Sequence, residues 1–263
     1  MFLVRKRLQA RTMVRSRPAD AVEQLARLAR AQRRMLPQVA PQVPGYQMAL
    51  AYQPAFTATG DYHDFFALPG GRNAVFVGDG TGHGPAASLL GATARAVFRS
   101  HPGMHGEPGD TLTAAGRLLF DLIPPDLFMT GVYIVLEDGG WVSWASAGHE
   151  TPMRVSPVGG VNASDAAVVG LPLGVELGET YATVRWQLSP GERLLLVTDG
   201  LWEARDSAGQ AFGRRRLQAE LARFAALSLG AAVRAIVARA AEHRGESEFE
   251  DDFTIVGIER RAT

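Results

Sequence analysis

Aspartates stand at four places where a predicted β-strand begins or ends: Asp61, Asp79, Asp199 and the pair Asp251–Asp252. If the fold brings these carboxylates to one sheet edge, each like-charged pair ~4 Å apart repels by ~4 kcal/mol at an effective dielectric of 20. Such a cluster persists only if protons or divalent cations offset the charge. Oxygen ligands without cysteine select hard cations, magnesium or manganese. Two such ions ~3.5–4 Å apart can activate a water for attack on phosphorus, which is the chemistry of a phosphomonoester hydrolase.

The segment Gly78–Gly84 has the densest glycine pattern in the chain. It reads Gly-Asp-Gly-Thr-Gly-His-Gly, with glycine at four of seven positions, between an apolar strand and a helix. Glycine lets the backbone bend and approach a ligand closely, and the amides that precede a helix face any bound anion. No Lys-Ser or Lys-Thr follows, so the segment is not a phosphate-binding P-loop. This density favours a functional loop over a plain connection.

Each of the other three acidic positions also has a purely structural interpretation. Gly60-Asp61 is turn chemistry, and Asp199-Gly200 is compatible with a buried strand followed by an ordinary turn. Asp251 and Asp252 follow three nearby glutamates and fit a solvated acidic loop. The four positions together therefore carry more weight than any one of them.

Composition narrows the class of protein. The 263 residues are 46% hydrophobic and 21% charged, as in ordinary globular proteins, and this excludes disorder or a fibrous fold for most of the chain. The 27 basic and 27 acidic residues give zero net charge, so we expect no nucleic-acid partner. The chain has no cysteine, which excludes a thiol nucleophile or a thiolate metal site. No apolar run is long enough for a transmembrane segment, and we expect a cytoplasmic location.

The predicted elements run as strands, a helix pair, strands, a second helix pair and a last strand. This order favours antiparallel sheets covered by helices over a parallel, doubly wound sheet. The expected strands are 46–53, 62–68, 74–77, 128–136, 141–147, 153–155, 183–188, 193–198 and 253–259, and the expected helices are 86–98, 111–122, 213–224 and 230–243. No segment among these predicted strands and helices resembles a linker, so residues 44–263 are predicted to form one domain.

Two segments precede that domain. Residues 1–17 contain six basic residues and no acid, which predicts a flexible basic arm. Residues 18–40 are predicted to be a linker helix whose apolar seam follows Val22, Leu25, Ala29, Gln32 and Leu36. This seam can pack on the protein's own domain or pair with a second copy through residues 18–36, and the sequence leaves both open.

The motifs together resemble the PPM family of metal-dependent serine/threonine phosphatases (type 2C), in its bacterial SpoIIE/RsbU branch. They occur in family order over roughly residues 20–260. The matching stretches are Gly60–Phe66, Gly78–Ala87, Ser146–His149, Gly170–Gly174, Thr198–Ala204, Phe212-Gly213 and Asp251–Thr254. The resemblance implies an α+β fold, the αββα four-layer sandwich, in which helix pairs flank two antiparallel sheets.

The resemblance also implies a metal site and a substrate. By this resemblance Asp79 would bridge two Mn²⁺ or Mg²⁺ ions, with a third ion left open, and the Gly80 carbonyl would bind one of them. Asp61 holds a metal directly or through water; Asp199 and Asp251 hold the other, with Asp252 as the rival of Asp251. The implied substrate is phosphoserine or phosphothreonine on a STAS-type anti-sigma-factor antagonist, and Asp79 and Asp199 act through the activated water.

Two histidines and two departures qualify this expectation. His83 could protonate the leaving oxygen or make a hydrogen bond within its loop, and His149 could act in the reaction or brace a turn. Thr59 stands where the family usually has glycine, and His63 where an aromatic residue is common. The departure at Thr59 and the basic arm motivate an alternative: a catalytically weak, phosphatase-like module that sequesters a partner-switching protein.

Overall fold

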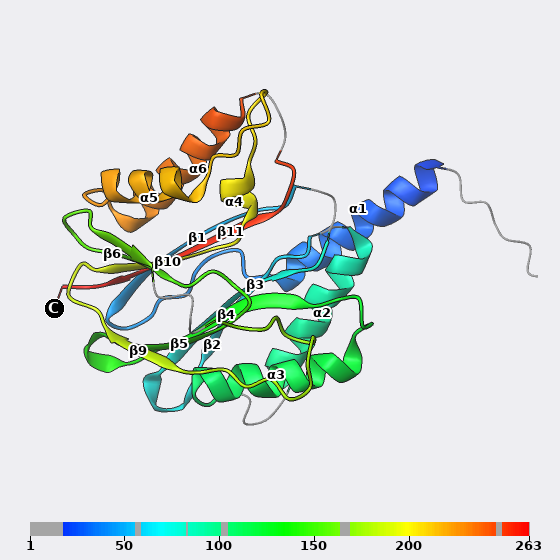
Figure 1. Cartoon of the computed structure of the whole chain (residues 1–263), viewed down its shortest axis with the longest axis horizontal. Coiled ribbons are helices and arrows are strands. Elements are labelled where there is room, and N and C mark those ends of the chain that lie inside the picture. The colour runs from blue at the N-terminus through cyan, green and yellow to red at the C-terminus, as the bar shows by residue number, and fades with distance from the viewer. Residues whose placement is uncertain are drawn as a thin grey trace, which may run out of the picture.

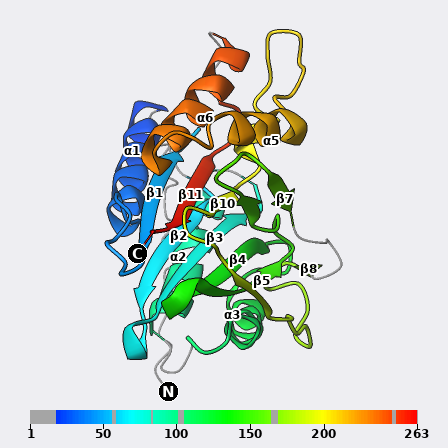
Figure 2. The same ribbon diagram turned by 90° about the vertical axis from the view of Figure 1, so that its left-hand side faces the viewer.

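The protein is two β-sheets stacked face to face, with helices on both outer surfaces (Figures 1 and 2). This computed structural model describes residues 18–55, 59–82, 84–100, 105–163, 169–245 and 249–262. The predicted arm, 1–17, lies outside the described residues, and so does His83. In the part that is described, no helix is both long and apolar enough to cross a membrane.

The first sheet has the strand order β1-β11-β10-β6-β7, and every neighbouring pair is antiparallel. Its strands are β1 (Tyr46–Gln53), β6 (Met153–Val155), β7 (Val161–Ala163), β10 (Arg193–Val197) and β11 (Phe253–Arg260). The first and last long strands of the chain thus pair along their whole length, which joins the two ends of the domain.

The second sheet has the order β2-β3-β4-β5-β8, and β9 also pairs with β5. Its strands are β2 (Tyr62–Ala67), β3 (Asn73–Gly80), β4 (Met129–Leu136), β5 (Trp141–Ala147), β8 (Val169–Gly170) and β9 (Val184–Gln187). The two-residue β8 runs parallel to β5, so the expectation of purely antiparallel sheets is wrong at this edge. Short one-turn 3₁₀ segments, Pro69–Gly71 and Asp138–Gly140, connect the β2–β3 and β4–β5 hairpins.

Helix pairs cover the outer faces of the sandwich. α2 (Pro85–Ser100) and α3 (Pro108–Leu122) contact strands of the second sheet, and α6 (Leu229–Arg244) contacts β1 and β11 of the first, with α5 (Arg214–Arg223) against α6. The one-turn α4 (Gly200–Glu203) follows β10. α1 (Pro18–Met35) projects from the body and touches α2 (Figure 1). The αββα fold class is therefore confirmed.

Alternation along the strands explains why four layers form. In β3, Val75 and Val77 face the apolar layer between the sheets, whereas Phe76 points outward into the layer under α2 and α3. In β11, Val256 enters the layer between the sheets and Ile255 packs beneath α5 and α6. A strand that is buried on both faces reads as a continuous apolar run, because side chains alternate between its two sides.

Register brings the predicted acidic positions to one end of the sandwich. Tyr62 lies opposite Gly78 in the β2–β3 pair, which puts the residue before β2 beside the end of β3. Val197 lies opposite Ile255, which likewise puts the residues after β10 beside the entrance to β11. The short elements β7, β8 and α4 were not predicted, because two to four residues carry too little periodicity.

Candidate active site

Asp61 is the most deeply buried acid of this end. It is 1% exposed, and its Oδ2 accepts hydrogen bonds from Thr198 Oγ1 at 2.9 Å and from Thr254 Oγ1 at 2.5 Å. Both threonines belong to the opposite sheet. Burial raises the pKa of Asp61 well above its ordinary value, and the charge of Asp79 raises it further. Asp61 thus joins the two sheets at the place where the acids meet.

Asp79 lies at the end of β3, where the charges of nearby acids affect its pKa. Burial is the main cause that raises its pKa to about 8, followed by the charges of Asp199, Asp251 and Asp252. Because the charges of three other acids act on this one carboxyl group, the four acids lie within one local field. The sequence positions 61, 79, 199, 251 and 252 therefore do meet at one end of the molecule.

Asp251 and Asp252 occupy different surroundings. Asp252 is 3% exposed; its Oδ1 accepts from the Ala55 amide at 2.8 Å and its Oδ2 from the Gly60 amide at 3.0 Å. Asp251 accepts one hydrogen bond, from the Asp252 amide at 2.8 Å, and burial with the charges of Asp252 and Asp199 raises its pKa. Both oxygens of Asp252 are occupied by main chain, whereas Asp251 keeps free oxygen lone pairs.

Two glycines permit the close approach of these segments. A Cβ on Gly200 would lie 2.0 Å from the Asp252 carbonyl oxygen, and a Cβ on Gly60 would lie 2.5 Å from the Gly80 carbonyl oxygen. Neither position tolerates a side chain without moving backbone. The glycine that follows Asp199 therefore lets the turn after β10 touch the entrance to β11, and Gly60 lets the loop before β2 lie against Gly80.

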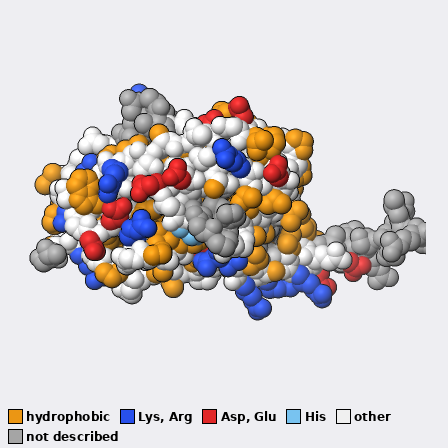
Figure 3. Space-filling view, turned by 90° about the horizontal axis from the view of Figure 1, so that it is seen from below, with side chains coloured by type: hydrophobic (Ala, Val, Ile, Leu, Met, Phe, Trp, Pro, Cys, Tyr) orange, Lys and Arg blue, Asp and Glu red, His pale blue; other side chains and the backbone are white. Residues whose placement is uncertain are grey.

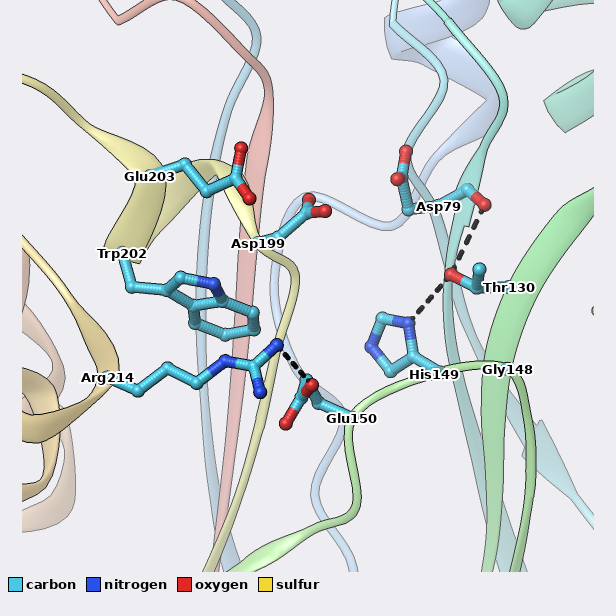
Figure 4. A pocket seen from close by; sticks show the side chains of 9 residues that line it. All are labelled: Asp79, Thr130, Gly148, His149, Glu150, Asp199, Trp202, Glu203 and Arg214. Atoms are coloured by element: carbon cyan, nitrogen blue, oxygen red, sulfur yellow. Dashed lines mark hydrogen bonds and ion pairs between the residues drawn. The ribbon is translucent and has the colours of Figure 1, made fainter. Parts of the chain in front are cut away.

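A cavity of about 150 Å³ opens beside these acids. The carboxylates of Asp79 and Asp199 approach it from opposite sides, and Trp202 forms one wall (Figure 4). The guanidinium of Arg214 stands 5.2 Å from the centre of the Trp202 ring and forms an ion pair with Glu150 at 2.5 Å. The complete lining is Asp79, Thr130, Gly148, His149, Glu150, Asp199, Trp202, Glu203 and Arg214.

His149 faces the cavity from the turn after β5. Its Nδ1 lies 2.9 Å from Thr130 Oγ1, and its main-chain carbonyl accepts a hydrogen bond from Ser146 Oγ at 2.7 Å. His149 is 6% exposed. Burial lowers the pKa of His149 to about 4, and a hydrogen bond with the Val197 backbone opposes part of this shift. The ring is therefore neutral at physiological pH.

α1 reaches the acidic end through one glutamine. Gln32 is 7% exposed; its Nε2 donates to the Thr59 carbonyl at 2.6 Å, and its Oε1 accepts from the Thr59 amide at 3.0 Å. Thr59 Oγ1 in turn accepts from the Asp61 amide at 3.0 Å. The side-chain amide of Gln32 thus fixes the main chain at Thr59, two residues before Asp61. Thr59, which departs from the family pattern, therefore helps to hold Asp61 in place.

We expect Gln32→Leu to weaken Mn²⁺ binding several-fold and to destabilise the fold by about 1–3 kcal/mol, because it leaves a buried amide and carbonyl of Thr59 unpaired. Isothermal calorimetry measures the affinity and urea denaturation the stability. Gln24→Leu is the matched control, since Gln24 is exposed on the same helix. Equal Mn²⁺ affinity in both variants would contradict a positioning role for Gln32.

The arginines after the glycine loop have structural partners. Arg99 pairs with the buried Asp64, to which its Nε donates at 2.6 Å, and Arg95 Nε donates to the Met35 carbonyl at 2.9 Å. Arg99 ties α2 to β2, and Arg95 ties it to the end of α1. Among the described residues, the arginine that lines the cavity is Arg214.

The donor set fits a hard divalent cation in chemistry. It consists of carboxylate and carbonyl oxygens, with no thiolate in the chain. After burial, the charges of Asp199, Asp251 and Asp252 raise the pKa of Asp79, and a dication would neutralise these charges. In the described part of the chain, no three acid or histidine side chains are already arranged to hold one ion. Binding therefore requires rotation of these side chains toward a common point.

Sequence patterns found the acids but missed several residues of the site. Thr130, Glu150 and Arg214 line the cavity, and no motif pointed to them. Thr198 and Thr254 lie within the recognised motifs as hydroxyls next to acids, a signal that could have been used. Gln32 could have been found as the polar member of an otherwise apolar seam.

The fold agrees with comparisons to known proteins. The family model for Stage II sporulation protein E (SpoIIE) matches residues 69–261, which is more than half of the chain. The chain therefore belongs to the SpoIIE family and contains a phosphatase domain of the PP2C type, homologous to PP2C serine/threonine phosphatases. The PP2C family is metal-dependent.

Three known proteins are similar to this chain. The SiaA-PP2C domain of Pseudomonas aeruginosa superposes with a TM-score of 0.81 at 21% identity, covering 92% of this chain and 97% of that one. The structure of the RsbU and RsbW domains of Rv1364c from Mycobacterium tuberculosis gives 0.75 at 25% identity, covering 87% and 63%. Protein IcfG of Synechocystis sp. is 26% identical over 81% of this chain, which spans 38% of the length of IcfG.

Proposed function

We propose that the protein is a metal-dependent phosphatase that removes phosphate from phosphoserine or phosphothreonine of a regulatory protein. The observation that supports this most directly is the convergence of acids on the buried Asp79: burial, followed by the charges of Asp199, Asp251 and Asp252, raises its pKa to about 8. Protonated carboxyl groups bind metal poorly, and ionised carboxylates this close together repel one another. A pair of divalent cations would favour the ionised form and neutralise the repulsion. Mn²⁺ or Mg²⁺ fits this oxygen donor set.

Roles for the acids follow from their surroundings. Asp79 lies between the other acids and is proposed to contact both ions, with the Gly80 carbonyl on one of them. Asp199 and Asp251 are proposed as ligands from the first sheet, and Asp61, held by two threonines, as the buried ligand that orients Asp79. Asp252 is proposed to fix the loop around Gly60 rather than to bind metal.

The chemistry needs no protein nucleophile. When bound, the ions would supply the charge that makes water nucleophilic and that neutralises the phosphate. The chain's own groups would hold the reactants: Asp79 and Asp199 face the same cavity, and Trp202 forms one of its walls. Arg214 and Glu150 lie at this cavity as an ion pair, available to contact a polar peptide around the phosphorylated residue.

We propose a STAS-type anti-sigma-factor antagonist as the substrate protein. The support is membership of the SpoIIE family and similarity to a chain that contains RsbU and RsbW domains. Dephosphorylation of such an antagonist would release a partner switch. The other candidate function is a catalytically weak module that sequesters the same kind of partner, and the departure from the family pattern at Thr59 motivates it. The hydrogen bonds of Thr59 to Gln32 and Asp61 support the loop that carries Asp61, which favours the enzyme.

Hydrolysis of p-nitrophenyl phosphate and of phosphoserine and phosphothreonine peptides tests this function. We expect hydrolysis with Mn²⁺ or Mg²⁺ and its loss with EDTA. Equal rates with metal and with chelator would exclude the metal-dependent mechanism. Rates of the wild type no higher than those of Asp79→Asn, together with intact binding of a phosphorylated STAS protein, would support the sequestering module instead.

The exposed part of α1 is proposed to pair with a second copy of the chain. Val22, Leu25 and Leu28 are 66%, 37% and 38% exposed, whereas the same seam is buried farther along at Gln32 and Leu36. Arginines of this helix leave its outer side solvated, and basic side chains gather toward this end of the molecule in Figure 3. The seam thus packs on its own domain at one end and is open at the other.

We expect the double variant Leu25→Glu, Leu28→Glu to lower the dimer fraction at micromolar concentration about tenfold or more, since two charges would face an apolar seam. Sedimentation velocity measures the change. Leu177→Glu is the control, because Leu177 is 50% exposed on a loop outside α1. A wild type that is monomeric at high concentration would contradict pairing through this helix.

A further inference from the structure

One positively charged side chain lines the cavity beside the acids. Among the described residues of the lining, Arg214 is the single cation, and the acids are Asp79, Glu150, Asp199 and Glu203. Figure 4 shows Glu203 on the same side of the cavity as the two aspartates. The guanidinium of Arg214 lies across the cavity from them, next to Glu150. A substrate whose phosphoryl group meets the aspartates would therefore bring another part of its chain to Arg214.

Trp202 holds the guanidinium of Arg214 in place. The guanidinium carbon lies 5.2 Å from the centre of the Trp202 ring, and Trp202 is itself 6% exposed within the apolar core of the first sheet. A cation over the face of a tryptophan is attracted by the ring, more strongly than over the other aromatic residues. The position of the guanidinium at the cavity is thus set before a ligand arrives.

The ion pair between Arg214 and Glu150 is one that a ligand can replace. Nη2 of Arg214 lies 2.5 Å from Oε1 of Glu150, and the two side chains are 60% and 40% exposed. An ion pair this exposed contributes little free energy, because water solvates both groups when they separate. The pair of Arg99 with Asp64 differs, since the Asp64 side chain is fully buried. Exchange of Glu150 for a carboxylate of a ligand therefore costs little.

The first turn of α5 adds positive charge at this edge of the cavity. Arg214, Arg215 and Arg216 open the helix, and its first turn contains no acid. Backbone amides at the N-terminus of a helix carry partial positive charge, so acids are favoured there and cations are not. The three arginines therefore do not serve the stability of the helix, and the local charge favours an anionic ligand.

We propose that Arg214 selects the substrate protein by pairing with an aspartate or glutamate next to the phosphorylated residue, in exchange for Glu150. The inference rests on the proposed function and names the kind of sequence that the site accepts. A planar guanidinium matches a carboxylate through two parallel hydrogen bonds, which makes the contact directional as well as charged. Arg214 is thus a specificity-determining residue that contacts the peptide beside the phosphate, and Glu150 returns to water when the substrate binds.

Paired phosphopeptides measure this selection. One phosphoserine peptide has glutamate at the neighbouring positions on both sides of the phosphoserine, and the other has glutamine there. In saturating Mn²⁺ we expect the wild type to favour the glutamate peptide about tenfold in kcat/KM, and Arg214→Gln to lose most of this preference. Arg215→Gln is the matched control. It removes the same charge from the same helical turn, at an exposed residue outside the cavity lining, and should keep most of the preference.

Glu150→Gln is expected to act in the opposite direction. The substitution removes the carboxylate that competes for Arg214, so kcat/KM for the glutamate peptide should rise about twofold or more. The double variant Arg214→Gln, Glu150→Gln should lack this gain, because the guanidinium that the peptide would use is then absent. A gain of equal size in the double variant would contradict the exchange.

The remaining outcomes each decide the proposal. Equal kcat/KM for the two peptides in the wild type would overturn it, as would an equal loss of preference in Arg214→Gln and Arg215→Gln. A loss of p-nitrophenyl phosphate hydrolysis in Arg214→Gln as large as the loss on the glutamate peptide would also overturn it, and would place Arg214 on the phosphoryl group. If the wild type hydrolyses neither peptide, the proposed function fails, and calorimetric Kd values decide this inference. A binding preference for glutamate that Arg214→Gln removes would sustain it, and no preference would overturn it.

Discussion

Asp79→Asn is expected to lower kcat/KM for phosphate-ester hydrolysis about 10³-fold in saturating Mn²⁺. The substitution removes a negative charge at the point where the fields of Asp199, Asp251 and Asp252 meet. Loss of a metal-bridging carboxylate removes several kcal/mol of transition-state stabilisation, and ~4 kcal/mol corresponds to a factor of 10³. Asp138→Asn is the matched control, because Asp138 is exposed in the turn between β4 and β5.

The same substitution is expected to stabilise the metal-free protein at high pH. The pKa of Asp79 is about 8 in the folded chain against an ordinary 3.8. Between these two values the folded state binds more protons than the unfolded state, so the free energy of unfolding falls as the pH rises. Asparagine carries no charge and lacks this dependence.

Urea denaturation in EDTA measures the effect at two pH values. We expect Asp79→Asn to be about 1–2 kcal/mol more stable than the wild type at pH 8.5 and to approach or fall below it at pH 4. An activity loss accompanied by lower stability at pH 8.5 would indicate a folding defect rather than a lost ligand. Activity equal to that of Asp138→Asn would remove Asp79 from the site.

The acidic site could be predicted because its signals are local. An apolar run that ends in Asp-Gly marks the end of a strand, and Asp79 and Asp199 both follow such runs. Antiparallel strands place the end of one beside the start of the next, so acids at strand ends meet where the fold makes those strands neighbours. The layers were predictable for the same reason, since helices and strands occupy separate stretches with distinct periodicity.

Residues that depend on contacts distant in sequence could not be predicted in this way. Arg214 begins a helix, and the fold, in which α5 packs against α6 and β7, brings it to Glu150. The ambiguity between Asp251 and Asp252 was likewise local, because both acids precede the same strand. What distinguishes them is the position of Ala55 and Gly60, nearly 200 residues earlier.

Asp251→Asn is expected to impair metal binding and activity, whereas Asp252→Asn is expected mainly to lower the stability of the fold. Asp251→Asn should weaken Mn²⁺ binding and lower kcat/KM about 10²-fold with little change in stability, because Asp251 accepts a single hydrogen bond from the adjacent amide. Asp252→Asn should destabilise the fold by about 2 kcal/mol, because its NH₂ group would face one of two buried amide donors that now point at carboxylate oxygens.

Calorimetric titration with Mn²⁺ and urea denaturation, applied to both variants, separate the two roles. Asparagine at 252 still offers one carbonyl oxygen to the Ala55 or the Gly60 amide, so the loop before Asp61 should stay close to its native position. Mn²⁺ affinity should then fall less in Asp252→Asn than in Asp251→Asn. The reverse order of affinities, with a stable Asp252→Asn, would make Asp252 the ligand and Asp251 the residue that shapes the turn.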